Sequence, residues 1–240
     1  MLFRSVSEET CDNIVSGNLF PVLTNTSIIA KSRPEAGFLF PFMYRYFIIY
    51  KPYKVLSQFS KTESKATLAD FFKVPADVYP VGRLDEDSEG LLMLTNDKKL
   101  NHHILNPSFA HEREYYVQVE GKINEDAVMQ LQQGIEINID NTYYKTKPCR
   151  VSVFEMPPTV PERNPPIRFR ANIPDTWISM ILTEGKNRQV RKMCAKMGYP
   201  VLRLIRNRIE KIKIGSMQPG DIIELSKPII YKKLFHGKIL

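Results

Sequence analysis

The chain has 240 residues, 43% of them hydrophobic, which is ordinary for a globular protein and enough for one substantial core. No apolar run reaches the length of a membrane span, and the first residues lack the basic-then-apolar order of a secretory signal, so we expect a cytoplasmic protein with no membrane partner. The three cysteines are odd in number and widely scattered, which argues against a disulfide framework and against a zinc knuckle.

Basic charge is concentrated in one segment of the chain. Lys and Arg outnumber Asp and Glu by 34 to 26, which gives a net charge of +8. Residues 186–213 hold ten basic side chains and one acidic side chain, so the rest of the chain is almost neutral. A basic patch confined to one segment favours a nucleic-acid partner, although a face that merely aids solubility would look similar.

Residues 1–42 show no helical or strand period, and clear patterning begins only at Met43. We therefore predict an N-terminal extension over residues 1–42 that is either disordered or upstream of the true start. A single folded domain is predicted over residues 43–227. A basic C-terminal tail is predicted over residues 228–240.

The first predicted strand covers residues 46–50, and a turn with a second strand follows within residues 51–58. A short helical turn is predicted over residues 67–72, with a threonine as its cap. A polar turn over residues 82–90, with a glycine at each end, then runs into residues 91–94, which predict a buried strand. A rigid strand fixes the side chains of an adjoining loop, so this turn is a candidate functional loop, although a solvated acidic turn is the simpler interpretation.

The middle of the chain is predicted to alternate helices and strands. Residues 96–107 combine a helix start at Asn96 with apolar residues four apart and an Asn-Pro stop, and their two adjacent histidines lack the spacing of a metal pair. Residues 124–133 predict a second helix capped by Asn124. The prolines of residues 156–166 indicate an extended loop. Strands are predicted over residues 111–121, 135–139 and 150–154.

A strand over residues 177–183 leads into a helix that we expect Asn187 to cap. Its apolar residues fall on one buried stripe, and its basic residues lie on the other faces. Further strands are predicted over residues 201–205, 208–214 and 222–225. Because the helices and strands follow no strict βαβ order, we predict an α+β fold.

Three motifs lie on these predicted elements. Residues 82–85 read G-R-L-D and are followed by a serine, G-L-L and T-N-D. Residues 113–115 read R-E-Y at the start of an alternating strand, and residues 184–191 read E-G-K-N-R-Q-V-R. Together they resemble the motifs of the pseudouridine synthases, in the branch that modifies ribosomal RNA. The one departure is Arg113, where lysine is commoner.

The resemblance implies a mainly antiparallel sheet in two subdomains around an active-site cleft. It also implies that the chain converts a uridine in ribosomal RNA to pseudouridine, with neither a metal nor a cofactor. Asp85 is then the catalytic carboxylate, which either attacks C1′ of the ribose or removes a sugar proton. Tyr115 is expected to contact the base, and Arg191 to pair with Asp85, because a nearby cation keeps a carboxylate ionised inside a cleft.

The resemblance and the basic segment also suggest which residues contact RNA. Because the base must leave its stack, Arg83 is a candidate to fill the vacated space or to hold a phosphate. We expect a monomer acting on ribosomal RNA, most similar to the single-domain type that modifies the large subunit, with small-subunit RNA as the alternative. A non-catalytic RNA-binding or ribosome-assembly protein is the main competing class, and a glycosidase using Asp85 and Asp87 is a weaker one. The expected RNA-contacting residues are Arg83, Lys51, Lys186, Asn187, Arg188, Gln189 and Lys192.

Overall fold

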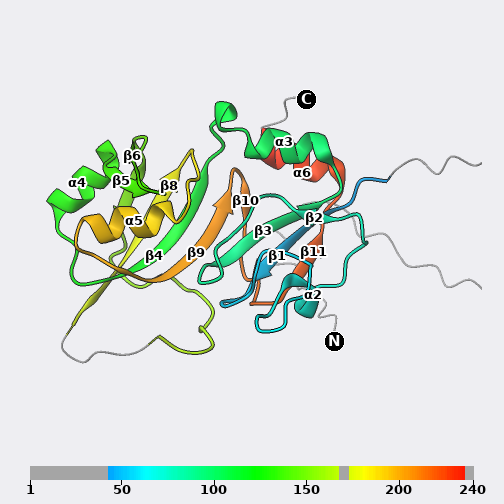
Figure 1. Cartoon of the computed structure of the whole chain (residues 1–240), viewed down its shortest axis with the longest axis horizontal. Coiled ribbons are helices and arrows are strands. Elements are labelled where there is room, and N and C mark those ends of the chain that lie inside the picture. The colour runs from blue at the N-terminus through cyan, green and yellow to red at the C-terminus, as the bar shows by residue number, and fades with distance from the viewer. Residues whose placement is uncertain (1–42, 168–172, 236–240) are drawn as a thin grey trace, which may run out of the picture.

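The computed structural model describes residues 43–167 and 173–235 (Figure 1). The expected N-terminal extension, residues 1–42, lies outside this range, as do residues 168–172 and 236–240. The helices are α2 (Leu68–Phe71), α3 (Lys98–Leu105), the short 3₁₀-helix Pro107–Phe109, α4 (Glu125–Gln133), α5 (Gln189–Lys196) and α6 (Lys227–Phe235). The strands are β1 (Tyr46–Lys51), β2 (Tyr79–Pro80), β3 (Glu89–Thr95), β4 (Arg113–Glu120), β5 (Glu136–Ile139), β6 (Thr142–Lys145), β7 (Arg150–Val153), β8 (Asp175–Leu182), β9 (Val201–Ile209), β10 (Ile212–Lys213) and β11 (Ile222–Glu224).

One sheet runs across the described part of the chain in the order β11-β1-β3-β9-β4-β8-β7, with β2 paired to β3 and β10 to β9. Its strands pair antiparallel except for β3 and β9, which run parallel in the middle of the sheet. The predicted α+β fold with a mainly antiparallel sheet is therefore confirmed. A separate hairpin of β5 and β6 lies beside α4 and α5 at one end of the molecule (Figure 1).

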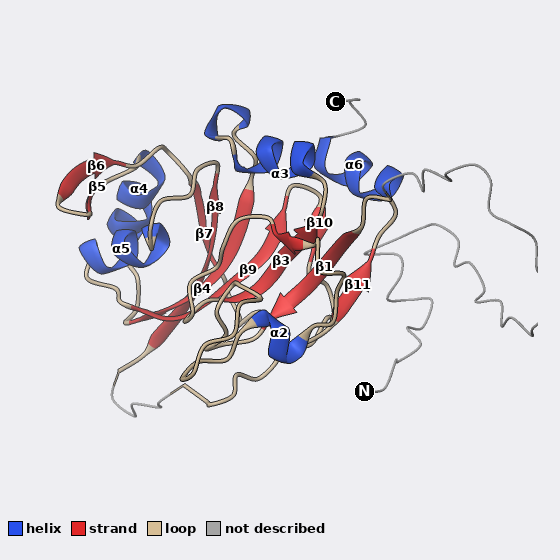
Figure 2. Ribbon diagram, turned by 45° about the vertical axis from the view of Figure 1, so that its right-hand side comes forward, coloured by secondary structure: helices blue, strands red, loops and turns tan. Residues whose placement is uncertain are grey.

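Each end of the sheet has its own apolar core. At one end, β1, β3 and part of β9 pack against α3 and α6, which lie side by side over one face (Figures 1 and 2). The other face of β1 and β3 is covered by the segment that contains α2. Strands β1 and β3 are buried along their whole length, as their unbroken apolar runs require. At the other end, β4 and β8 pack against α4 and α5.

One buried carboxylate, that of Asp97, joins β1 to α3 and α6. Its Oδ1 accepts hydrogen bonds from the backbone N–H groups of Lys99 and Leu100, and so caps α3 one residue later than the sequence predicts. Its Oδ2 accepts from the hydroxyls of Tyr46 at 2.8 Å and Tyr231 at 2.7 Å. Although burial opposes ionisation, these bonds hold the pKa of Asp97 below its usual range. The carboxylate therefore fixes both helices at the end of the sheet that carries β1 and β3.

Helix α6 is the largest departure from the sequence prediction. Most of residues 227–235 were expected to belong to a basic tail. They form a helix instead, and its Ile230, Leu234 and Phe235 are buried against the sheet. The folded region therefore extends to residue 235. No helix in the described ranges is both long enough and apolar enough to cross a membrane.

Smaller differences occur at turns and caps. Residues 51–58 form a turn with one isolated bridge, and not the predicted second strand. Helix α5 begins at Gln189 because Arg188 before it adopts a left-handed φ of 52°, so the predicted cap at Asn187 is wrong. The predicted cap at Asn124 is confirmed, since its side chain accepts a hydrogen bond in the first turn of α4.

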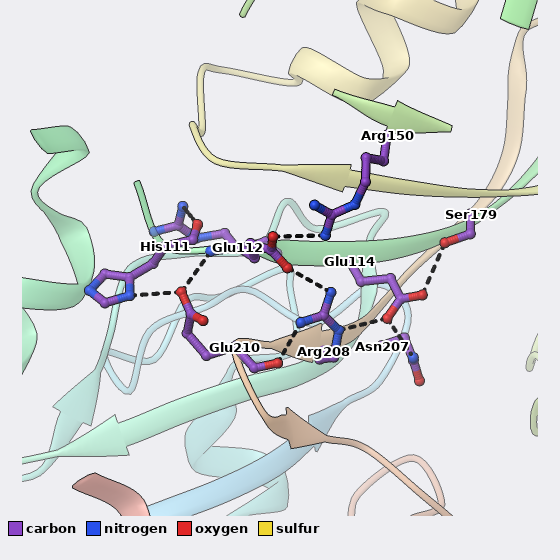
Figure 3. Close-up of polar contacts among 9 residues, drawn as sticks. His111, Glu112, Glu114, Arg150, Ser179, Asn207, Arg208 and Glu210 are labelled. Carbon is purple, nitrogen blue, oxygen red and sulfur yellow. Dashed lines mark hydrogen bonds and ion pairs between the residues drawn. The ribbon is translucent and has the colours of Figure 1, made fainter. Parts of the chain in front are cut away.

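A β-bulge at Asn207 sends two nearby arginines of β9 to opposite faces of the sheet. Glu114 of β4 pairs with Arg208, but the next residue, Tyr115, pairs with Arg206, so Asn207 is an extra residue in β9. Arg208 donates to Glu114 at 2.9 Å within the polar network of Figure 3. Because successive side chains of β4 alternate between faces, Arg206 shares the other face with Tyr115. The network of Figure 3 also includes His111, Glu112, Arg150, Ser179 and Glu210.

Candidate active site

The loop of residues 81–88 is fixed on both sides of Asp85. Before it, Leu84 donates its N–H to the Ser57 hydroxyl at 3.0 Å, and its carbonyl accepts from the same hydroxyl at 2.7 Å. After it, the Ser88 N–H donates to the Asp85 carbonyl at 3.0 Å and closes a turn. The next residues enter β3, which is buried throughout. The Asp85 side chain is therefore carried on a backbone with little freedom to move.

This loop lines one side of a cleft of about 670 Å³. The volume falls within the range of roughly 300–1,000 Å³ that is usual for small-ligand sites. The sheet contributes Tyr115 from β4 and Leu204 and Arg206 from β9, and residues 182–190 between β8 and α5 complete the lining. The cleft therefore gathers all three sequence motifs, which are far apart along the chain.

The acidic side chains of the loop have different partners. Glu86 binds Lys65 at 2.6 Å at the surface. Asp87 forms two hydrogen bonds with Arg188, at 2.9 and 2.7 Å. Glu89 forms a buried bidentate pair with Arg203, at 3.0 and 2.8 Å.

Asp85 is the exception among these acidic residues. Its shortest ion-pair distance is 3.8 Å, to Nη1 of Arg188, and 37% of its side chain is exposed. Glu86, Asp87 and Glu89 are each committed to a close basic partner. Asp85 is therefore the acidic residue of this segment with the longest ion-pair distance, and its side chain lies in the lining of the cleft.

Arg191 lies beside Asp87 and not in the expected direct pair with Asp85. Its Nη2 donates to the Asp87 carbonyl at 2.5 Å, and its Nε lies 3.3 Å from the Asp87 carboxylate. Its Nη1 donates to the Val201 carbonyl at 3.2 Å, which ties the loop to the start of β9. Although burial opposes ionisation, the hydrogen bond from Arg188 and the charges of Arg191 and Arg188 hold the pKa of Asp87 below its usual range.

Two residues that were expected to contact RNA, Lys51 and Gln189, are buried in the structure. Lys51 is fully buried, and its ammonium donates to the carbonyls of Pro52 at 3.0 Å and Val55 at 2.6 Å. Burial lowers its pKa to about 8. Gln189 is 4% exposed and uses its amide to bind Glu184 and the backbone of Lys186. Both side chains support loops of the cleft and have no free surface for a phosphate.

The other expected RNA contacts lie at the surface. Arg83, Lys186, Asn187 and Arg188 are exposed and line the cleft. Lys192 is half-buried on α5 and is not part of the lining. Exposed cations at the mouth of a cleft are placed to meet a polyanion.

Arg206 is a cleft residue that the sequence analysis missed. It lies directly opposite Tyr115 in the β4–β9 pair, and only 4% of it is exposed. A signal was present in the sequence, since β9 carries three arginines in an otherwise largely apolar strand, where buried charges are rare. The bulge that separates Arg206 from Arg208 has no comparable signal.

The fold and the site together define a class of RNA-modifying enzymes. A family model described as RNA pseudouridylate synthase matches residues 45–196, and the chain belongs to this family. It is similar to the ribosomal large subunit pseudouridine synthase E of Vibrio parahaemolyticus, with 46% identity over 178 residues that cover 74% of this chain and 72% of the relative. The corresponding protein of Xanthomonas campestris is 45% identical over 176 residues, which cover 72% of this chain and 91% of that one.

A solved structure supports the same assignment. The crystal structure of a pseudouridylate synthase superposes with a TM-score of 0.65 at 25% identity, over 80% of this chain and 74% of the other. A human protein, RNA pseudouridylate synthase domain containing 1, shares the fold, with a TM-score of 0.50 at 14% identity. The expected family and fold are therefore confirmed.

Proposed function

We propose that this protein isomerises a specific uridine of large-subunit ribosomal RNA to pseudouridine, with Asp85 as the catalytic carboxylate. The names of the relatives support the RNA class and the large-subunit target. The observation that carries the role of Asp85 is its position in the cleft lining without a close basic partner, whereas Glu86, Asp87 and Glu89 of the same segment each bind a basic side chain at 2.6–2.8 Å. We further propose that the protein acts as a monomer. A ribosomal RNA substrate is consistent with a cytoplasmic location.

The reaction exchanges one bond to the ribose for another. The bond from N1 of uracil to C1′ breaks, the base turns, and C5 bonds to C1′. The proton on C5 is then lost, and N1 gains a proton, so the product has the same composition as the substrate. Asp85 acts at the ribose, either by attack on C1′ or by removal of a sugar proton.

The surroundings of Asp85 keep it in position for this chemistry. Arg188 and Arg191 act mainly through Asp87, whose carboxylate they contact at 2.7–3.3 Å, and so hold the loop against α5. Tyr115 lines the same cleft and is placed to contact the base once it has left its stack. Holding a reacting group in one orientation accounts for a large part of catalysis in a bond exchange of this kind.

The exposed basic residues at the cleft supply affinity for the RNA backbone. Arg83, Lys186 and Arg188 carry charges that reach solvent beside the cleft. Contacts of this kind position the nucleic acid without reading its sequence, and they weaken as salt increases. We propose that Arg83, next to the catalytic loop, fills the space left by the extruded base or holds its phosphate.

The test measures loss of tritium from C5 of uridine in large-subunit RNA under single-turnover conditions. Asp85→Asn is expected to abolish release while RNA binding persists. Glu86→Gln is the matched control, because its carboxylate belongs to the same loop but binds Lys65 at the surface. Residual turnover of Asp85→Asn within about tenfold of the parent, roughly 1.4 kcal/mol of barrier, would remove Asp85 from the central role.

The competing class is a non-catalytic RNA-binding protein that uses the same exposed basic residues. Binding of ribosomal RNA by the parent protein, with no tritium release from either subunit's RNA, would favour that class. Release from small-subunit RNA alone would keep the enzyme and change its substrate. A map of pseudouridines in ribosomal RNA from cells that lack the protein would identify the modified position.

A further inference from the structure

Arg206 is a buried cation in the cleft with an unused hydrogen-bond donor. Its Nε donates to the Leu91 carbonyl at 2.8 Å. Its buried Nη2 has no hydrogen-bond partner among the residues that the structure describes. Leaving a buried, charged donor without an acceptor costs stability. In the lining of a cleft, such a donor points to an acceptor that arrives with the ligand.

Two features of the sheet hold Arg206 in this place. The bulge at Asn207 turns Arg206 toward the cleft face and Arg208 toward the network of Figure 3. Gly90 of β3 lies opposite Arg206 with a φ of +102°, and a Cβ there would come within 2.5 Å of the Arg206 carbonyl oxygen. Bulges next to active sites commonly redirect a side chain, and glycine allows the two backbones to approach closely.

The positive charge of Arg206 is also not paired with a carboxylate in the part of the chain that the structure describes. Arg188 and Arg203 each bind a carboxylate at 2.7–2.8 Å. No carboxylate within the described ranges forms an ion pair with Arg206. Burial lowers the pKa of Arg206. The Tyr115 phenol opposes that change through its charge and a side-chain hydrogen bond, and the nearby charge of Arg113 adds to it. A cation in this setting favours a ligand that is negatively charged or becomes so during the reaction.

We propose that Arg206 is a catalytic residue that stabilises the negative charge on uracil when its bond to the ribose breaks. The inference rests on the proposed function. Whether Asp85 attacks C1′ or removes a sugar proton, the N1–C1′ bond breaks with its electron pair on N1. Conjugation spreads this charge to the carbonyl oxygens O2 and O4. Arg206 donates a hydrogen bond from Nη2 to one of these oxygens, and no proton is transferred in this interaction.

The symmetry of uracil makes one fixed donor sufficient for both halves of the reaction. A half-turn about the N3–C6 axis brings C5 to the former place of N1. The same half-turn exchanges the two carbonyl groups. A donor held by the sheet therefore meets an equivalent oxygen before and after the base turns. Arg206 then retains the detached base while Asp85 acts at the ribose.

The test replaces Arg206 by Met and by Lys. Methionine keeps a long side chain but removes the positive charge, and lysine keeps the positive charge but removes the planar guanidinium with its several donors. Single-turnover tritium release is expected to fall by roughly 10²–10³-fold for Arg206→Met, as when one donor to a developing anion is removed, and by less for Arg206→Lys. RNA affinity is expected to stay within about threefold of the parent. Arg208→Met is the matched control, because Arg208 lies on the same strand but faces the network on the other side.

A second substrate separates stabilisation of the anion from a merely structural role. Fluorine at C5 makes uracil a better leaving group, so breakage of the N1–C1′ bond depends less on Arg206. The defect of Arg206→Met in consumption of 5-fluorouridine at the target site is expected to be at least about tenfold smaller than its defect on uridine. Equal defects on the two substrates would overturn the proposal.

A Tyr115→Phe variant tests whether Arg206 acts directly on the base or only through the Tyr115 hydroxyl. If Arg206 acts on the base, Arg206→Met retains its full defect in that background; loss of the defect would contradict the proposal. A parent protein that releases no tritium from any ribosomal RNA would defeat the proposed function itself. An active parent whose Arg206→Met variant stays within about threefold of its rate would defeat only the role of Arg206.

Discussion

The Arg191 side chain contacts both the backbone and the side chain of Asp87, with Nη2 at 2.5 Å from the Asp87 carbonyl oxygen and Nε at 3.3 Å from the Asp87 carboxylate. Asp87 lies two residues after Asp85, and Arg191 lies on α5, more than a hundred residues further along the chain. The contact therefore sets where the proposed catalytic carboxylate stands relative to the basic side of the cleft.

Replacing Arg191 by Lys is expected to lower the single-turnover rate by about 10–100-fold, with RNA affinity nearly unchanged. Lysine keeps the charge but cannot bridge Asp87 and the Val201 carbonyl as a planar fork does, so the loop loses its fixed position. Arg150→Lys, at a surface pair with Glu112, is the control. A rate for Arg191→Lys within twofold of the parent would show that this contact does not position the loop.

Replacing only one member of the Glu89–Arg203 ion pair is expected to destabilise the protein strongly. The Arg203 side chain is 6% exposed and that of Glu89 is 1% exposed, so the loss of either partner leaves a buried charge. Glu89→Gln and Arg203→Met are each expected to lower the free energy of unfolding by about 3–5 kcal/mol, measured in urea. The double variant should lose at least about 2 kcal/mol less than the sum of the two. Additive losses would mean that the pair is not coupled.

Lys51 is expected to make stability rise with pH above neutrality. Burial lowers its pKa to about 8 from 10.5, so between these values the unfolded chain binds more protons than the native one. Burying the lysine therefore weakens the native state near pH 7, and this penalty decreases as pH rises from about 8 toward 10.5. In urea unfolding from pH 7.5 to 9.5, the parent should gain on the order of 2 kcal/mol relative to Lys51→Met. Parallel curves for the two proteins would contradict the lowered pKa.

Gly90 and Gly220 offer a matched pair of glycine substitutions. Both have positive φ, of +102° and +95°, but a Cβ at Gly90 would meet the Arg206 backbone at 2.5 Å, whereas a Cβ at Gly220 would meet nothing within 4 Å. Gly220→Ala should cost about 1 kcal/mol of unfolding free energy, from backbone strain alone. Gly90→Ala should cost at least about 1–3 kcal/mol more, because β3 and β9 must separate. Equal costs would show that the close approach of the strands is not needed.

Much of the fold could be predicted from local patterns. The apolar runs of β1 and β3, the alternation in β4 and the Asn124 cap of α4 are signals within a few neighbouring residues. Helix α6 was missed because its basic residues suggested a tail, while the apolar surface that buries Leu234 belongs to strands far away in sequence. Tertiary packing decided the structure there, and local charge did not.

The site was only partly predictable for the same reason. The motifs predicted one site, and the structure places Asp85, Tyr115 and Arg188 in the lining of the same cleft. It could not distinguish Asp85 from Asp87 as the partner of Arg191, because that depends on how the loop meets α5. It also could not show that Lys51 is buried, since its three nearest acceptors are backbone carbonyls that no side-chain pattern reveals.

The path of the chain through the sheet has a genetic consequence. After β3 the chain builds β4 to β8 with α4 and α5, returns through β9, and only then adds β11 and α6 beside β1 and α3, where it began. A nonsense mutation near codon 220 would leave every cleft residue encoded. It would nevertheless remove the strand that pairs with β1 and the helix that buries Ile230 and Leu234. We expect such an allele to behave as a null, although the missing residues lie outside the cleft.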